Sequence, residues 1–242
     1  MRKMLVSLVF VLGLASPAWG AVVCGNAIEQ NDVAPASATI TVSYTTPDPC
    51  VDCTTFVGAT SRGSATINSA THAGNAMTGI AAEATVSPIH TRAFRIVNPT
   101  SGTNDVVVTF SGTPLAEAIV ISTCSGTNTA APIHDATNAT GTGTAITVTV
   151  PNLVAGDVVI DMFGTDVATS DPTEGANQTV LHKGNDGAEL GYGSSQQAAA
   201  DGGVMSWTTA LSQEWAQQAF AVSPAAAASI LQAPSLPMFL FE

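Results

Sequence analysis

Residues 95–112 read RIVNPTSGTNDVVVTFSG, two apolar segments on either side of a turn-forming stretch. The first segment belongs to a predicted strand at 91–97 and the second to a predicted strand at 105–111. The residues between them are Asn, Pro, Thr, Ser and Gly, which favour turns. In the second strand Val106, Val108 and Phe110 share one face, the period of two expected of a half-buried strand. The stretch therefore predicts an antiparallel hairpin.

The same pattern of short β-rich segments, separated by Gly, Pro, Asn, Asp and Ser, recurs along the chain. Residues 144–150 show it most clearly, because Ile146, Val148 and Val150 alternate with threonines. No stretch has convincing helical periodicity. Short strands at near-regular spacing are typical of an all-β sandwich or barrel, and one antiparallel sandwich accounts for the length. The predicted strands are 38–44, 54–60, 65–69, 91–97, 105–111, 116–123, 144–150, 157–163, 178–183, 204–209 and 214–222.

The composition supports this fold class. Only 10% of the 242 residues are charged, against about 25% in a typical soluble domain. Threonine, about five times as frequent as Lys and Arg together, carries much of the missing polarity and suits the pleated face of a sheet. This composition disfavours a helical bundle, a coiled coil and a basic protein that binds nucleic acid.

The N-terminus resembles a signal peptide. Residues 1–20 combine a basic start, an apolar stretch too short to span a bilayer, Pro17, and small residues before a predicted cleavage after Gly20. A membrane anchor and a lipoprotein with Cys24 are the alternatives, but Val23 is not the small residue that a lipobox requires. Cleavage leaves four basic residues against 18 acidic ones, a net charge of −14. We therefore expect a secreted protein, extracellular or at the cell surface, with no nucleic-acid partner and no membrane span once the signal is removed.

The expected organisation after the signal peptide is an N-terminal extension at 21–37, a β-sandwich domain at 38–224 and an apolar tail at 225–242. The four cysteines of the mature chain are Cys24, Cys50, Cys53 and Cys124. An even count in an exported protein predicts two disulfides, with three pairings open. A redox or metal role is the alternative for Cys50 and Cys53, but their strand-rich context and the scattered histidines favour a structural role.

The order of these segments resembles a jelly-roll-type β-sandwich module that recurs in bacterial secreted and surface proteins and in phage structural proteins. The most specific matching pieces are the hairpin at 95–112 and the predicted closing strand, WAQQAFAVSP at 215–224. The strand ATITVSY at 38–44, AGDVVID at 155–161 and MSW at 205–207 match as well. The resemblance implies a jelly-roll-like fold and an extracellular structural or recognition role, usually without an assigned activity.

No catalytic residues are predicted. The sequence contains no nucleophile elbow, no zinc-protease motif, no phosphate-binding loop and no EF-hand. Arg95 and Asp161 lie in predicted strands and need partners if buried, which favours a structural ion pair over a binding cleft. Asp166, Asp171 and Glu174, in one polar loop, offer oxygen ligands for a structural Ca²⁺, although a solvated acidic loop is the preferred interpretation. No other cofactor is expected.

Trp207 and Trp215 are eight residues apart in consecutive predicted strands. If both rings were exposed, they would form a platform for stacking sugars, so glycans are candidate partners. A large aromatic side chain within a strand is more often part of a core, which we expect for at least one of them.

The tail is strongly apolar near its end, where Leu236, Met238, Phe239, Leu240 and Phe241 surround a single proline. Such side chains gain free energy from burial, so we expect the tail to pack on its own sandwich or to add a strand to a neighbouring subunit. The sequence thus favours a non-catalytic structural or adhesive surface protein that self-associates through this segment. A carbohydrate-binding module is the first alternative and a secreted hydrolase the second.

Overall fold

The structure, a computed structural model, describes residues 21–33, 37–167, 169–185 and 189–226. In these ranges the chain consists of antiparallel β-strands and one short 3-10 helix, η1 (Ala199–Asp201), with no α-helix. The predicted all-β sandwich is therefore confirmed. No helix of the described part is long and apolar enough to cross a membrane. The predicted signal peptide and the assembly residues of the tail lie outside these ranges.

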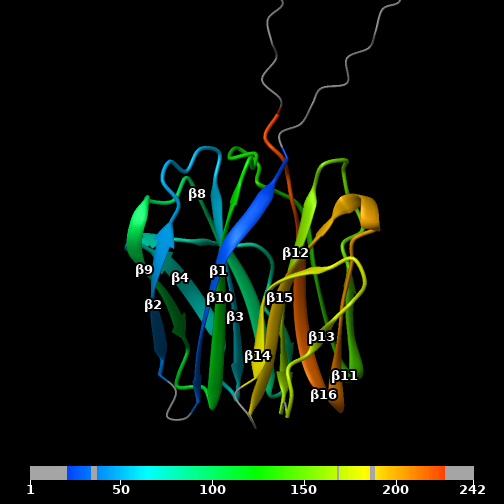
Figure 1. The fold of residues 1–242 in the computed structure, drawn as a ribbon. Helices are drawn as coiled ribbons and strands as arrows, with labels where there is room; N and C mark the ends of the chain where they lie inside the picture. The colour runs from blue at the N-terminus through cyan, green and yellow to red at the C-terminus, as the bar shows by residue number, and fades with distance from the viewer. Residues whose placement is uncertain (1–20, 34–36, 168, 186–188, 227–242) are drawn as a thin grey trace, which may run out of the picture.

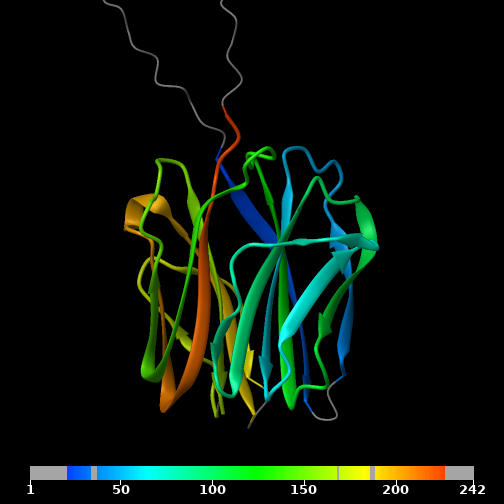
Figure 2. The same ribbon diagram turned by 180° about the vertical axis from the view of Figure 1, so that it is seen from behind.

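The strands form three sheets that are stacked face to face (Figures 1 and 2). The central sheet contains β1 (Val23–Val33), β10 (Ala116–Ser125), β3 (Thr54–Arg62) and β8 (Ile89–Val97), with β6 (Thr78–Gly79) and β7 (Ala84–Val86) on β8. One outer sheet contains β2 (Thr39–Thr46), β9 (Gly102–Phe110), β4 (Ile67–His72) and β5 (Asn75–Ala76). The other contains β11 (Ile133–Thr149), β16 (Val204–Val222), β12 (Val158–Asp166), β15 (Leu190–Ala198) and β14 (Thr179–Asn185), with β13 (Thr173–Glu174) on β16.

The first two sheets have the connectivity of a jelly roll. The pairs β1 with β10, β2 with β9, β3 with β8 and β4 with β5 are all antiparallel. The first strand therefore pairs with the last, the second with the one before the last, and so on toward the middle of this part of the chain. This is the arrangement of one long hairpin that is rolled into two layers. The predicted hairpin at 95–112 is the connection from β8 to β9, but its two strands belong to different sheets.

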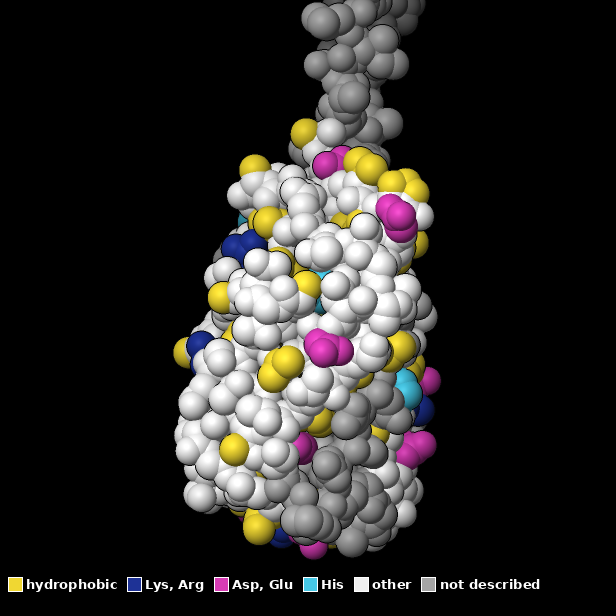
Figure 3. Space-filling view, turned by 90° about the vertical axis from the view of Figure 1, so that its left-hand side faces the viewer, with side chains coloured by type: hydrophobic (Ala, Val, Ile, Leu, Met, Phe, Trp, Pro, Cys, Tyr) yellow, Lys and Arg dark blue, Asp and Glu magenta, His cyan; other side chains and the backbone are white. Residues whose placement is uncertain are grey.

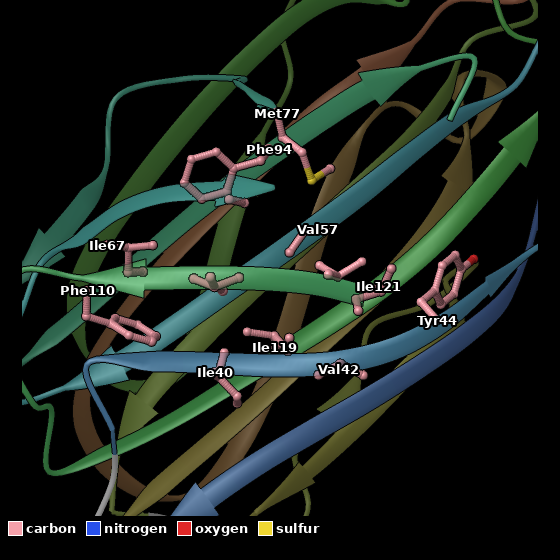
Figure 4. Packing of buried hydrophobic residues seen from close by; sticks show 14 of the residues in the cluster. Ile40, Val42, Tyr44, Val57, Ile67, Met77, Phe94, Phe110, Ile119 and Ile121 are labelled. Atoms are coloured by element: carbon pink, nitrogen blue, oxygen red, sulfur yellow. The ribbon is translucent and has the colours of Figure 1, made fainter. Parts of the chain in front are cut away.

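The core between these two sheets follows the alternation of the sequence. In β2, Ile40, Val42 and Tyr44 are buried while the residues between them are exposed. They pack on Ile119 and Ile121 of β10, as Figure 4 shows. The outward residues of β2 are Thr and Ser, and Figure 3 shows this side of the molecule mostly as uncharged polar surface. The threonine-rich composition thus covers a solvated sheet face.

The third sheet covers the opposite face of the central sheet. Phe56 of β3 packs on Phe220 of β16, with ring centroids 5.1 Å apart. The two sheets approach closely at Gly164 of β12, where an added Cβ atom would lie 1.8 Å from Thr60 Oγ1. The central sheet is therefore buried on both faces, which explains why β10 is buried along nearly its whole length.

Several parts of the chain differ from the strand prediction, among them residues 133–143, which extend the strand predicted at 144–150 to form β11. Residues 23–33, predicted as an extension, form β1, and residues 190–198 form β15, which the sequence analysis does not predict. The two predicted strands at 204–209 and 214–222 are one element, β16. It must bend sharply, because ten residues of straight strand span about 33 Å, yet Trp207 and Gln217 both donate to Asp161.

Candidate functional site

The four cysteines form two disulfides, as predicted. Cys24 of β1 is bonded to Cys124 of β10, directly opposite in the register, with Cα atoms 4.0 Å apart. Cys50 and Cys53 close the loop between β2 and β3. The first bond fixes the edge strand β1 to the central sheet, and the second is a local staple in the loop.

Both ends of the described chain lie at one end of the molecule, which we call the terminal pole (Figure 1). The Ala225 amide donates to the Gly126 carbonyl at 2.7 Å. Gly126 has a φ of +69°, and a Cβ atom there would lie 2.6 Å from the Ala21 carbonyl oxygen, so glycine is required. The start of the described chain and the root of the C-terminal segment therefore share this pole.

Three cavities open at or near the terminal pole, and they are the best candidates for a functional site. The largest, about 350 Å³, lies between the start of β1 and the strands β14 and β15. The second, about 280 Å³, lies between β1 and the loop that contains Pro47 and Pro49. The third, about 240 Å³, contains Pro224 at the root of the C-terminal segment. Exposed apolar side chains line them, namely Val23 (62% exposed) in the first two and Val154 (46%) in the third.

The third cavity contains an oriented histidine. His134 Nδ1 lies 3.0 Å from Oδ2 of the buried Asp157, and the same oxygen accepts a hydrogen bond of 2.9 Å from the Val154 amide. Ser223 lines the same cavity, but no hydrogen bond joins it to His134 in the described part of the chain. Each of the three cavities is lined by at most one acidic residue, so none supplies the pair of carboxylates that a glycosidase uses.

Asp161 is an acid that lies fully buried in the interior of the third sheet. Its carboxylate accepts hydrogen bonds from the Ser195 amide (2.6 Å) and hydroxyl (2.9 Å), from Trp207 Nε1 (2.6 Å) and from Gln217 Nε2 (2.8 Å). Burial raises the pKa of Asp161 to about 6, although all four donors favour the charged form. Arg95 is not among its partners, so the considered ion pair is absent. This cluster holds the third sheet together.

Both candidate stacking residues are buried. Trp207 is 1% exposed and packs on Phe163, while Trp215 is 8% exposed and packs over Gly141. Neither ring presents a face to solvent, so they do not form the platform considered from the sequence. The bend of β16 places both in the same interior cluster.

The three acids considered for Ca²⁺ are dispersed among separate partners. Asp166 pairs with Arg62, Glu174 accepts from Lys183 Nζ at 2.7 Å, and Asp171 accepts from Asn185. The Lys183 bond lowers the pKa of Glu174. Within the described ranges no three His, Cys, Asp or Glu side chains are grouped to hold a metal ion. The structure therefore does not bring the proposed calcium ligands together.

No protein-family model matches this chain, and no curated protein matches it.

The largest cavity is the feature that sequence reasoning missed. Its polar lining residues are Asn177, Thr179, Gln196, Gln197 and Asp201, together with Val22, Val23, Cys24, Val158 and Ala198. These segments are far apart in the sequence and meet only because β1 lies beside β14 and β15. The sole local signal is the pair of amides at 196 and 197, in a stretch without clear alternation.

Proposed function

We propose that this chain is an exported, non-catalytic structural or adhesive β-protein whose copies join through the apolar C-terminal segment, residues 229–242. Two disulfides support export to an oxidising compartment. The absence of a cationic field and the dispersal of the acids among structural contacts support a non-catalytic role.

One observation carries the self-association: the last described residues, which precede the proposed donor segment, and the best acceptor edge lie on different surfaces. The described chain ends at the terminal pole, where Ala225 is anchored to Gly126. Strand β2 lies at the end of its sheet on the flank of the molecule (Figure 1) and, within the described chain, pairs only with β9. A contact between two different surfaces is heterologous and generates an open chain of copies rather than a closed dimer.

The β2 edge is suited to accept a strand. Residues 39–46, TITVSYTT, contain no proline and no charged residue, the two devices that commonly protect an exposed edge. The residues of the C-terminal segment contain one acid, Glu242, so little charge opposes the contact. Addition of an extended segment would satisfy the open backbone groups of β2 and bury apolar side chains of the segment.

Light scattering coupled to size-exclusion chromatography tests this function on the mature chain, residues 21–242, and on a chain ending at residue 228. We expect the full chain to form concentration-dependent multimers and the shortened chain to be monomeric. Circular dichroism controls for folding of both. A monomer in both cases would overturn the proposal.

A second pair of variants tests the acceptor. Lysines placed on the exposed face of β2, in Thr41→Lys with Ser43→Lys, should abolish the multimers. Lysines at the exposed Thr147 and Thr149 of β11, another edge strand, are the matched control and should leave the multimers unchanged. If both changes abolish the multimers equally, the added positive charge causes the loss, and the β2 edge is not the acceptor.

A further inference from the structure

The largest cavity is a groove with two different walls. One wall is the start of β1, with Val22 and Cys24, and the other is formed by β14 and β15. Thr179 of β14 lies opposite Gln196 of β15 in the register, so the two polar side chains are neighbours. With a volume of about 350 Å³, the groove is of the size that small-molecule sites occupy.

Several polar side chains of the groove have no hydrogen-bond partner among the described residues. The side chains of Asn177, Thr179 and Gln196 and the carboxylate of Asp201 make no hydrogen bond with any described residue. Together they offer two amides, one hydroxyl and one carboxylate, hence both donors and acceptors. The neighbouring Gln178, in contrast, is paired with Ser195 and Ser206.

The backbone beneath these groups is held in place before any ligand arrives. Gln197 is buried and its Nε2 donates to the Asp201 carbonyl at 3.2 Å, while the Ala199 amide donates to the Asp157 carbonyl at 3.0 Å. These bonds fix η1 and with it Asp201. The disulfide from Cys24 to Cys124 fixes the opposite wall. A site with fixed walls loses little conformational entropy on binding.

The chemistry of the lining restricts the ligand. Among the described residues, no Lys or Arg lines the groove and Asp201 is acidic, so these residues offer an anion no counter-charge. They include no aromatic ring, so a planar aromatic ligand has no stacking partner among them, and one carboxylate is too few for a cation site. Uncharged donors and acceptors above apolar Val22 and Val158 match a molecule with many hydroxyls and apolar C–H faces.

We propose that this groove binds a neutral saccharide, with Asn177, Thr179, Gln196 and Asp201 as its hydrogen-bonding groups. The site does not depend on the two tryptophans, which are buried, nor on the C-terminal segment. It goes beyond the proposed self-association, and a protein that fails to assemble can still bind at the groove.

Chemical-shift perturbation on the mature chain tests the site directly. The probes are maltose, cellobiose, lactose and N,N′-diacetylchitobiose, each titrated to about 20 mM so that a dissociation constant in the millimolar range is detected. We expect saturable shifts for at least one probe, confined to amides of residues 22–24, 177–179 and 196–201. Absence of shifts for all four overturns the proposal, as does binding of trialanine, a peptide probe, in their place.

Three variants test whether saccharide binding depends on the residues of the groove. Gln196→Leu removes an amide at similar size, and Asn177→Gly removes one while tolerating the φ of 63° at that position. Each should weaken binding about tenfold, the effect of one lost hydrogen bond. Thr147→Val, on a distant exposed strand, is the control and should bind as the wild type does. Binding that is unchanged in both groove variants would contradict the assignment.

Discussion

The indole Nε1 of Trp207 donates a hydrogen bond of 2.6 Å to Oδ2 of Asp161, which joins the first half of the bent strand β16 to the neighbouring strand β12. Trp207 belongs to the first half of β16 and Gln217, which donates to the same oxygen, to the second. Asp161, on β12, thus binds both halves of β16 through its side chain. Its protonation and its partners are therefore the most sensitive internal probes of this fold.

The stability of the protein should depend on pH through Asp161. Its pKa is raised to about 6 in the folded chain from 3.8, so between these values the folded state binds a proton that the unfolded state has lost. The contribution of Asp161 to the free energy of unfolding is largest below pH 3.8. It decreases by about 3 kcal/mol in total as the pH rises from below 3.8 to above 6.

Urea denaturation at pH 4, 5, 6 and 7 measures this effect, with Asp161→Asn as the reference, since other acids titrate in the same range. The wild-type free energy of unfolding, relative to that of the variant, should decrease by about 2 kcal/mol between pH 4 and pH 7. Parallel pH profiles for the two proteins would show that Asp161 has no raised pKa.

The two buried tryptophans should respond differently to the same substitution. Trp207→Phe removes a hydrogen bond to a buried carboxylate as well as ring area, so we expect a loss of about 2–4 kcal/mol. Trp215 Nε1 is buried and makes no hydrogen bond with the described residues, so Trp215→Phe loses ring area alone, about 1–2 kcal/mol. Chemical denaturation of both variants provides the comparison, and equal losses would refute the importance of the Asp161 bond.

The two disulfides should contribute unequally to stability. Cys24 and Cys124 are 100 residues apart and Cys50 and Cys53 only three, so the first bond restricts the unfolded chain far more. The chain-entropy relation gives about 5 kcal/mol for the long loop and about 2 kcal/mol for the short one. Paired Cys→Ser variants, compared by thermal denaturation, should rank in that order. The reverse order would mean that the short loop stabilises the fold by another route.

The stacking of the third sheet on the central one should depend on Gly164. Any larger side chain there meets Thr60, so Gly164→Val should cost at least about 1–3 kcal/mol by overpacking. Gly112→Ala is the control, because a Cβ atom at Gly112 meets nothing within 4 Å. Denaturation midpoints of the two variants test this, and a neutral Gly164→Val would be inconsistent with the close approach.

Local alternation predicted much of this fold but not its layering. The apolar residues of 39–46 and 105–110 define strands and buried faces without any tertiary information. Strand β1 was missed because VCGNAIEQNDV has no clean period, and its extended state depends on pairing with β10. Strand β15 was missed because LGYGSSQQA is rich in Gly and polar residues, which are buried by neighbouring strands.

The candidate site was less predictable than the fold. The tryptophans suggested a sugar platform because the sequence does not show that β16 bends and encloses them. The groove lined by Asn177, Gln196 and Asp201 has no local pattern, since its walls come from both ends of the chain. The disulfide count was predictable from the sequence, while the pairing required the register of β1 with β10.

The central claim, that the C-terminal segment of one copy adds to β2 of another, is tested most directly by cross-linking two singly substituted proteins. All four native cysteines are paired, so Phe239→Cys in one protein and Ser43→Cys in the other introduce single reactive thiols. Mixed under mild oxidation, they should form a heterodimer on a non-reducing gel, and Thr147→Cys in place of Ser43→Cys should not. No heterodimer, or an intramolecular bond in the doubly substituted chain at high dilution, would contradict assembly through this edge.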